Sequence, residues 1–136
     1  MLWFSPTGHS DPDGGWYNPY ETRAYDDNEN TYALTEVTRR NTWSKFLYLT
    51  HSPKLCSKIR VLNKDAIPGN NYYHDIDVYK DGSWVGVYYG SGIGTTWKEI
   101  SFGVGVVSQM RIRVRRLTGP SYVVMRITEV DFYMAS

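Results

Sequence analysis

The chain has 136 residues and a formal net charge of +1, so it fits one domain with its own core and carries no charge excess for nucleic acid or membranes. Twelve Tyr, five Trp and four Phe raise the aromatic share to 15%, which favours strands over helices. No apolar run reaches the roughly 20 residues of a membrane helix, and the first residues do not resemble a signal peptide. The single cysteine, Cys56, excludes an internal disulfide, and its apolar neighbours favour a buried side chain over a nucleophile.

Short β-rich runs alternate with turn signals along the chain, and we expect no helix of any length. Strands are expected over residues 31–38, 43–50, 55–62, 72–80, 83–89, 97–102, 106–117 and 122–133, the last as two strands or one bent one. Asp81-Gly82 predicts a tight hairpin turn, and residues 118–121 predict a second turn. The pattern predicts an all-β sandwich or jelly roll of about eight antiparallel strands. A single domain would cover residues 1–136, with 1–20 as an ordered lead-in and 21–134 as the jelly roll.

Alternation of side chains assigns the two faces of several strands. We expect an inward set of Ile59, Val61, Tyr72, His74, Ile76, Val78, Met110, Ile112 and Val114. The outward set includes Arg111, Arg113 and Arg115. Together with Arg116 and Arg126 they form either an anion-binding stripe or a solvated face balanced by acids such as Asp75 and Asp77. The near-neutral net charge favours the solvated face.

Motifs of catalysis are missing from the sequence. It contains no nucleophile elbow, no metalloprotease helix motif, no paired cysteines and no phosphate loop, and none of its histidines has a second His or Cys at zinc-ligand spacing. Asp75 and Asp77 are neighbours on one strand face, which does not make the carboxylate pair of a glycosidase. We therefore expect a protein that is not an enzyme.

Several segments in order resemble discoidin-like, galactose-binding-like domains, such as coagulation-factor C-type domains and family-32 carbohydrate-binding modules. The segments are AYDDNENTYA, HDIDVYKDGSWVGVY, WKEISF with VVSQMRIRVRR, and RITEVDFY, and together they run from about residue 20 to residue 133. The resemblance implies an eight-stranded antiparallel jelly-roll β-sandwich. It also implies a structural Ca²⁺ ion that ties the chain start to the chain end.

Carried over by position, the resemblance implies one set of calcium ligands: the Ala24 carbonyl, the Asp26 carboxylate, the Asn28 carbonyl, Thr31 and the Glu129 carboxylate. These are hard oxygen donors of the kind that calcium prefers. Asp27 replaces the family's usual Gly, and Asp tolerates the positive φ of that turn better than most residues. Ala33 replaces the usual Trp, and Trp43 or Tyr32 could fill the core position that this Trp leaves.

Members of these families mostly bind sugars through loops at one end of the sandwich, where rings stack on sugar faces and polar side chains bind hydroxyls. The corresponding loops here are residues 39–43 and 68–74. Their candidate ligand-binding residues are Arg40, Asn41, Trp43, Asn70, Asn71, Tyr72, Tyr73 and His74. His74 either points into the loop end or caps the core, and for Trp43 we favour a place in the core.

Two functional hypotheses follow. The first is a non-catalytic carbohydrate-binding domain that is stabilised by calcium and binds a glycan or polysaccharide. The second is a structural or adhesion protein of a virion or cell surface, such as a phage tail or capsid accessory protein, with protein partners or glycan attachment. Both imply an extracellular or virion-surface location. Nucleic acid is not an expected partner, and a membrane is disfavoured because Ile67, Ile93 and residues 104–107 are the only apolar loop candidates.

Overall fold

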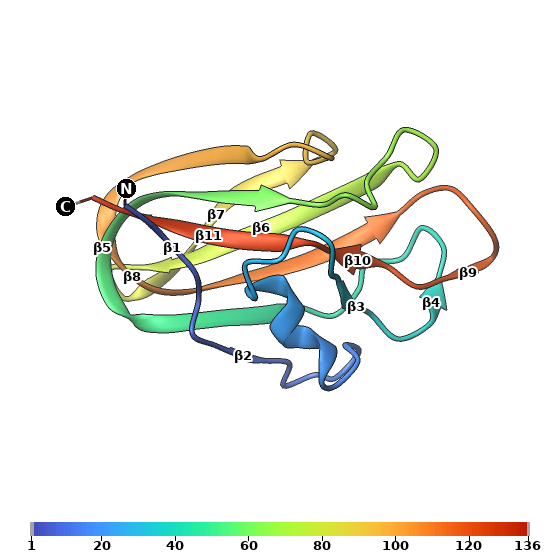
Figure 1. Cartoon of the computed structure of the whole chain (residues 1–136), viewed down its shortest axis with the longest axis horizontal. Coiled ribbons are helices and arrows are strands. Elements are labelled where there is room, and N and C mark those ends of the chain that lie inside the picture. Colours follow the sequence, from blue (N-terminus) through green and yellow to red (C-terminus); the bar gives the residue numbers. More distant parts are fainter. Residues whose placement is uncertain (1, 136) are drawn as a thin grey trace.

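The computed structural model describes residues 2–135, which form eleven strands and one 3-10 helix. In chain order these are β1 (Trp3–Phe4), β2 (Gly8–Ser10), η1 (Tyr20–Ala24), β3 (Ala33–Leu34), β4 (Thr38–Arg39), β5 (Leu47–Leu62), β6 (Tyr72–Lys80), β7 (Ser83–Gly90), β8 (Lys98–Arg116), β9 (Tyr122–Val123), β10 (Arg126–Ile127) and β11 (Glu129–Met134). The largest sheet has the order β1-β11-β5-β8-β6-β7, with β2 also paired to β5. All of its pairs are antiparallel, and the all-β sandwich expected from the sequence is confirmed (Figure 1).

Two long strands, β5 and β8, bend and join the layers of the sandwich. The sequence predicted two strands in place of each, but β5 runs for 16 residues and β8 for 19. Their pairing shifts register after Thr50, where Pro53 cannot donate to the ladder, and the bend in β8 includes Gly103 at φ +80°. Figure 1 shows both strands turning at the same end of the molecule.

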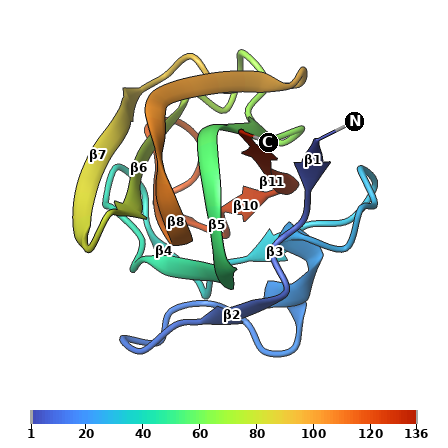
Figure 2. The same cartoon turned by 90° about the vertical axis from the view of Figure 1, so that its left-hand side faces the viewer.

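Each half of the bent strands therefore serves a different layer. The first part of β5 and the last part of β8 lie with β2, β6 and β7, whereas their other halves lie with β11 and β1. Figure 2 shows this sheet curving around the core, with the short strands β3, β4 and β10 beside it. Those short strands form two small antiparallel pairs, β3–β10 and β4–β9.

Three expectations about secondary structure were wrong. Residues 31–38 hold one two-residue strand and the start of another, and residues 122–133 hold three short strands instead of one or two. The 3-10 helix η1 was not expected, because a single turn of five residues is too short to show a helical period in the sequence.

The amino-terminal lead-in joins the sheet. Its strand β1 pairs with β11, β2 pairs with β5, and Trp16 is buried beside Thr35. The start of the chain therefore lies against its last strand, as Figure 1 also shows for the two ends.

Side-chain alternation places the core as predicted. Every residue of the inward set from Ile59 to Val114 is buried, and Arg111, Arg113 and Arg115 lie on the outer face. Cys56 is fully buried, and burial raises the pKa of its thiol to about 11, which confirms a packing role over a nucleophilic one. Asp81 and Gly82 both have positive φ, so the predicted hairpin turn is confirmed.

Two expectations about apolar residues are corrected. Neither Trp43 nor Tyr32 is buried, so neither fills a core position beside Ala33. Ile93 is buried in the core and is not an exposed loop residue. Among residues 2–135, no helix is long and apolar enough to span a membrane.

Candidate functional site

Arginine and aromatic side chains alternate in one continuous stack on the outer face of the β5–β8–β6–β7 layer. Each guanidinium in this stack lies within 5.0 Å of the centres of two rings. We call this stack the arginine–aromatic ladder, and its members in order are Tyr73, Arg115, Trp43, Arg113, Phe46, Arg111 and Trp84.

The distances within the ladder are uniform. Arg115 lies 4.9 Å from the Trp43 ring centre and 5.0 Å from that of Tyr73. Arg113 lies 4.9 Å from Trp43 and 4.8 Å from Phe46. A guanidinium within about 6 Å of a ring is attracted by the negative face of that ring. Each contact therefore holds the neighbouring side chain in place, and the ladder is preorganised.

Strand geometry explains why the ladder forms. Arg111, Arg113 and Arg115 alternate along β8 with buried residues, so all three project to one face. Tyr73 on β6 is the direct cross-strand partner of Arg115. Trp84 on β7 stacks at 4.3 Å on Arg111.

Charge along the ladder is uneven. Arg111 donates to Asp77 at 2.7 Å, and Arg113 donates to Asp75 at 2.8 Å, so the balanced face predicted for these two arginines is confirmed. Arg115 forms no ion pair with any carboxylate of residues 2–135. Its Nε is buried and without a hydrogen-bond partner in the same part of the chain. One end of the ladder thus carries an uncompensated guanidinium.

This end of the ladder lies beside the loops of the sandwich. Tyr89 of β7, a residue that is 64% exposed, packs on Trp43 with ring centres 5.5 Å apart. Asn41 and Asn71 both have positive φ, and their main chains bond to residues 116 and 117 at the end of β8. The two predicted loops therefore meet at the end of the strand that carries Arg115.

The predicted ligand-binding residues divide into an exposed and a buried group. Trp43 and Tyr73 meet at Arg115, and the exposed Asn41 and Asn71 lie next to them. The core position favoured for Trp43 was wrong, because its ring is half-buried on the outer face.

Arg40 and Asn70 have structural partners at the same end. Arg40 Nη1 donates to the Gly119 carbonyl at 2.7 Å, and Asn70 Nδ2 donates to the Asp65 carbonyl at 2.7 Å. Both side chains therefore fix loops and keep only part of their hydrogen-bonding capacity for a ligand.

Tyr72 and His74 belong to the core, and we remove them from the site. His74 is fully buried, its Nε2 lies 3.0 Å from Asn63 Nδ2, and burial lowers its pKa to about 3. The Tyr72 hydroxyl donates to Asp65, and burial raises the pKa of this phenol. The alternative in which His74 caps the core is the one that the structure supports.

Phe46, Trp84 and Tyr89 were not among the predicted site residues. Each lies on the outer face and completes the ladder or extends it. The alternation of side chains within 83–89 and the outward arginines of β8 were the sequence signals for an aromatic face. The pairing of β7 with β6 and of β6 with β8, which brings the rings together, is visible only in the structure.

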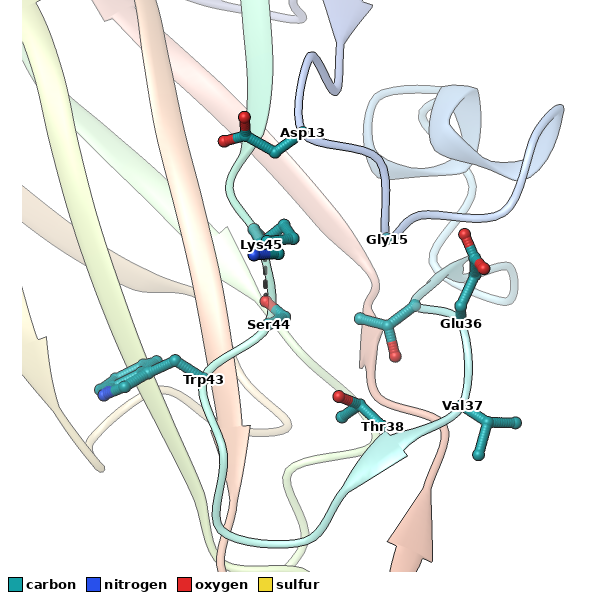
Figure 3. Close-up of a pocket in the computed structure, with 9 residues that line it drawn as sticks. Asp13, Gly15, Glu36, Val37, Thr38, Trp43, Ser44 and Lys45 are labelled. Carbon is teal, nitrogen blue, oxygen red and sulfur yellow. Dashed lines mark hydrogen bonds between the residues drawn. The ribbon is translucent and has the colours of Figure 1, made fainter.

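Two pockets flank this end of the molecule. One of about 240 Å³ is lined by polar residues that include Asp13, Glu36 and Lys45, and the Trp43 ring points away from these residues (Figure 3). The other, of about 260 Å³, lies between residues 66–72 and 91–94. We place the candidate site on the ladder because stacking rings and an unpaired cation occur together there, next to both predicted loops.

A separate cluster of carboxylates lies between the loop after η1 and β11. Glu129 is 1% exposed, and among residues 2–135 neither of its carboxylate oxygens has a hydrogen-bond partner. The nearby Thr31 hydroxyl lies 2.7 Å from Asp26 Oδ2 and 3.2 Å from the Asn28 carbonyl. Four of the five residues implied as calcium ligands thus belong to one region, and Ala24, the fifth, is buried at the end of η1.

Excess negative charge makes this cluster unusual. Carboxylate oxygens of Asp27, Glu129 and Asp131 lie within 4.8 Å of one another. Burial and the neighbouring carboxylates, first that of Asp26, raise the pKa of Glu129 to about 9. Arg60 compensates only Asp131, at 2.7 and 2.9 Å. The oxygen-rich donor set and the unpartnered Glu129 fit a bound calcium ion.

The local backbone agrees with that role. Asp27 has φ +57°, so the positive φ expected where the family carries Gly is confirmed. Asp27 and Asp131 were not among the predicted ligands. Asp131 lies two residues after Glu129 and therefore on the same face of β11, a spacing that could have identified it.

Similarity to solved structures identifies the fold. The sequence matches no protein-family model and no curated protein. The structure of "CBM32 of AlyQ in complex with 4,5-unsaturated mannuronic acid" matches with a TM-score of 0.67 and 16% identity over 99% of this chain and 100% of that one. Chitosan-binding module 1 of a chitosanase/glucanase from Paenibacillus sp. IK-5 matches at 0.63 and 17%, over 96% of both chains. The family 32 module of C. perfringens NanJ, in complex with galactose, matches at 0.58 and 19%, over 96% of this chain and 90% of that one.

The chain therefore has the galactose-binding-like, discoidin-like jelly-roll fold of the family 32 carbohydrate-binding modules, as the sequence segments implied.

Proposed function

We propose that this protein is a non-catalytic carbohydrate-binding domain that acts outside the cell or on a particle surface and is stabilised by a structural calcium ion. The observation that carries the proposal is the meeting of Trp43 and Tyr73 at Arg115, with the exposed Tyr89 packed on Trp43. Aromatic rings offer apolar surface for the C–H face of a sugar, while a guanidinium offers several donors in a fixed plane for its oxygen atoms. Both requirements of a sugar site are thus present together.

Support for this proposal also comes from the fold. The three structural matches described above are carbohydrate-binding or chitosan-binding modules by name, and they match nearly the whole chain.

The calcium part of the proposal rests on the carboxylate cluster. Asp26, Asn28, Thr31 and Glu129 would hold the ion, with Asp27 and Asp131 close by. A bound cation would compensate the buried Glu129 carboxylate and link η1 and its following loop to the last strand. We assign the ion a stabilising role, because the cluster is formed by other elements than the ladder.

A glycan array followed by titration calorimetry tests the proposed function. The full chain is assayed in calcium-containing buffer against neutral and acidic oligosaccharides, and we expect saturable binding with a Kd between about 1 μM and 1 mM. Failure to bind any glycan at millimolar concentration, by a sample that unfolds cooperatively, would contradict the proposal.

A second candidate function is assembly on a virion or cell surface. Strand β7 is at the edge of the main sheet, and its sequence SWVGVYYG has neither a charge nor a proline. Such edges pair with strands of other chains unless they are protected. Light scattering over a hundredfold concentration range tests this candidate: a stable oligomer supports it, and a monomer throughout contradicts it.

A further inference from the structure

We propose that the ligand of the ladder is an acidic glycan, and that its carboxylate or sulfate group pairs with Arg115. The inference rests on the proposed function, because it names the class of carbohydrate that the same site would bind. Its basis is the difference between Arg115 and the other two arginines of the ladder.

Charge distinguishes Arg115 from the other two arginines of the ladder. Arg111 and Arg113 each have an aspartate at 2.7–2.8 Å, directly opposite on β6, and these pairs are electrically balanced. The residue opposite Arg115 is Tyr73, which brings an aromatic ring in place of a carboxylate. Within residues 2–135, Arg115 thus keeps a full positive charge and a buried Nε without a partner.

The geometry of Arg115 also suits an anion. The guanidinium of Arg115 is held between the rings of Trp43 and Tyr73, so its position is fixed before a ligand arrives. A planar guanidinium binds carboxylate or sulfate oxygens through paired N–H donors, and a fixed one loses little conformational entropy on binding. A sugar packed on the exposed ring of Tyr89, which lies against Trp43, would bring an acidic substituent to these donors.

The unpaired charge of Arg115 has a balanced pair as its neighbour on the ladder. Two residues further along β8, about 7 Å away, a ligand meets the Arg113–Asp75 pair, which offers no net charge. The surface therefore fits an acidic residue next to neutral ones. A polymer with a phosphate at every unit, such as single-stranded nucleic acid, would bring its further charges to the balanced Arg113–Asp75 and Arg111–Asp77 pairs, which do not compensate them.

Matched pairs of glycans test the inference in titration calorimetry. Each pair has one acidic residue in one member and none in the other: glucuronosyl-substituted and plain xylo-oligosaccharide, sialyllactose and lactose, and a sulfated galactan oligosaccharide with its desulfated form. A further pair consists of the acidic glycan that binds best in an array and its carboxyl-reduced or desulfated counterpart. Comparing the carboxylate pairs with the sulfate pairs shows which of the two anionic groups the site prefers. We expect the acidic member of the best pair to bind at least tenfold more tightly.

Two variants connect the preference to Arg115. In R115Q the acidic glycan should lose about tenfold or more in affinity, and its neutral counterpart less than about threefold. R115K keeps the charge without the planar stack and should retain part of the preference. Melting curves of both variants show whether they are folded.

The possible outcomes are distinct. Equal or tighter binding of neutral glycans, or equal losses for both members of the pair in R115Q, would overturn the inference and leave the proposed function in place. Tighter binding of an oligothymidylate than of every glycan would also overturn it. Binding of no glycan at all would contradict the inference and the proposed function together.

Discussion

Arg113 donates a hydrogen bond of 2.8 Å to Asp75, its direct partner across β6 and β8, and this pair separates the charged end of the ladder from the rest. The substitution Asp75→Asn keeps the shape of the pair and removes its negative charge. Arg113 would then be a second uncompensated cation next to Arg115. If the ligand is an acidic glycan, its affinity should rise about threefold or more in D75N, measured by titration calorimetry at low salt.

The cost of this substitution to the fold should be small. The Arg113 side chain is 33% exposed and that of Asp75 is 15% exposed, so water screens the pair. We expect the free energy of unfolding in urea to fall by about 1 kcal/mol or less. Weaker binding of the acidic glycan by a normally folded D75N would show that Asp75 itself contacts the ligand.

The length of the ladder predicts how affinity depends on glycan length. Tyr73 and Tyr79 lie six residues apart on β6, about 20 Å, and Trp84 packs beside Tyr79 with ring centres 5.3 Å apart. W84A should therefore weaken binding of a hexasaccharide severalfold and leave a disaccharide within about twofold of wild type. If the affinity of the wild-type protein does not increase for glycans longer than a disaccharide, the site is restricted to the Arg115 end of the ladder.

The carboxylate cluster predicts a calcium-dependent melting temperature. With calcium at about 100 times its Kd, binding adds about 2.7 kcal/mol to the free energy of unfolding, which for a domain of this size raises Tm by roughly 10 °C over EDTA. E129Q should show no calcium shift, because it removes the buried anion that the ion compensates. In EDTA the same variant should melt at or above the wild-type temperature, since Gln avoids the cost of protonating a carboxyl group that is ionised in the unfolded chain.

E99Q is the matched control, since Glu99 is exposed, pairs with Lys58 and is separated from the cluster by Arg60 of β5. Its calcium shift should equal that of the wild type. If wild type and E99Q melt at the same temperature with calcium and with EDTA, the calcium part of the proposal is wrong.

Burial of His74 predicts a loss of stability in mild acid. The pKa of the folded state, about 3, lies below the ordinary value of 6.5, so the folded protein binds fewer protons than the unfolded chain. The stability that the neutral His74 contributes to the folded protein is therefore fully present above pH 6.5 and is lost as the pH falls toward 3. Between pH 7 and pH 5 this single group should lower the free energy of unfolding by roughly 2 kcal/mol.

Urea unfolding of the wild type and of H74Q at pH 7 and pH 5 checks this prediction. The free energy of unfolding should fall more for the wild type than for H74Q, and the difference between the two losses measures the effect of His74. Ring nitrogen shifts of His74 in NMR give a direct second measurement and should not titrate above pH 5. A titration midpoint near 6.5 would contradict the buried, neutral state of this histidine.

Much of the fold was predictable from local sequence. Alternation in 72–80 and 106–117 gave the faces of both central strands, because one face of each packs on the core. Asp81-Gly82 gave the hairpin turn through its requirement for positive φ. The continuity of β5 and β8 through their bends was not predictable, because Pro53 and Gly103 give the same local signals at a bend and at a chain break.

The candidate site was predictable only in part. Trp43, Tyr73 and the two loop asparagines came from loop position and residue type, and Arg115 appeared as one member of a stripe. Which arginine remains unpaired depends on cross-strand register, which places Tyr73 opposite Arg115 and Asp75 opposite Arg113. A shift of one register position would leave a different arginine without an aspartate partner. No local sequence pattern indicates which register the two strands adopt.

The most direct test of the central claim is the affinity of two tryptophan variants for the glycan that the wild-type protein binds most tightly. Trp43 stacks on Arg113 and Arg115 in the ladder, whereas Trp97 stacks on Arg60 in the other layer, so W43A and W97A remove similar contacts on different surfaces. If the ladder is the site, W43A should weaken binding at least tenfold, and W97A should stay within about twofold of wild type. Unchanged affinity in a folded W43A, or equal losses in both variants, would contradict the account.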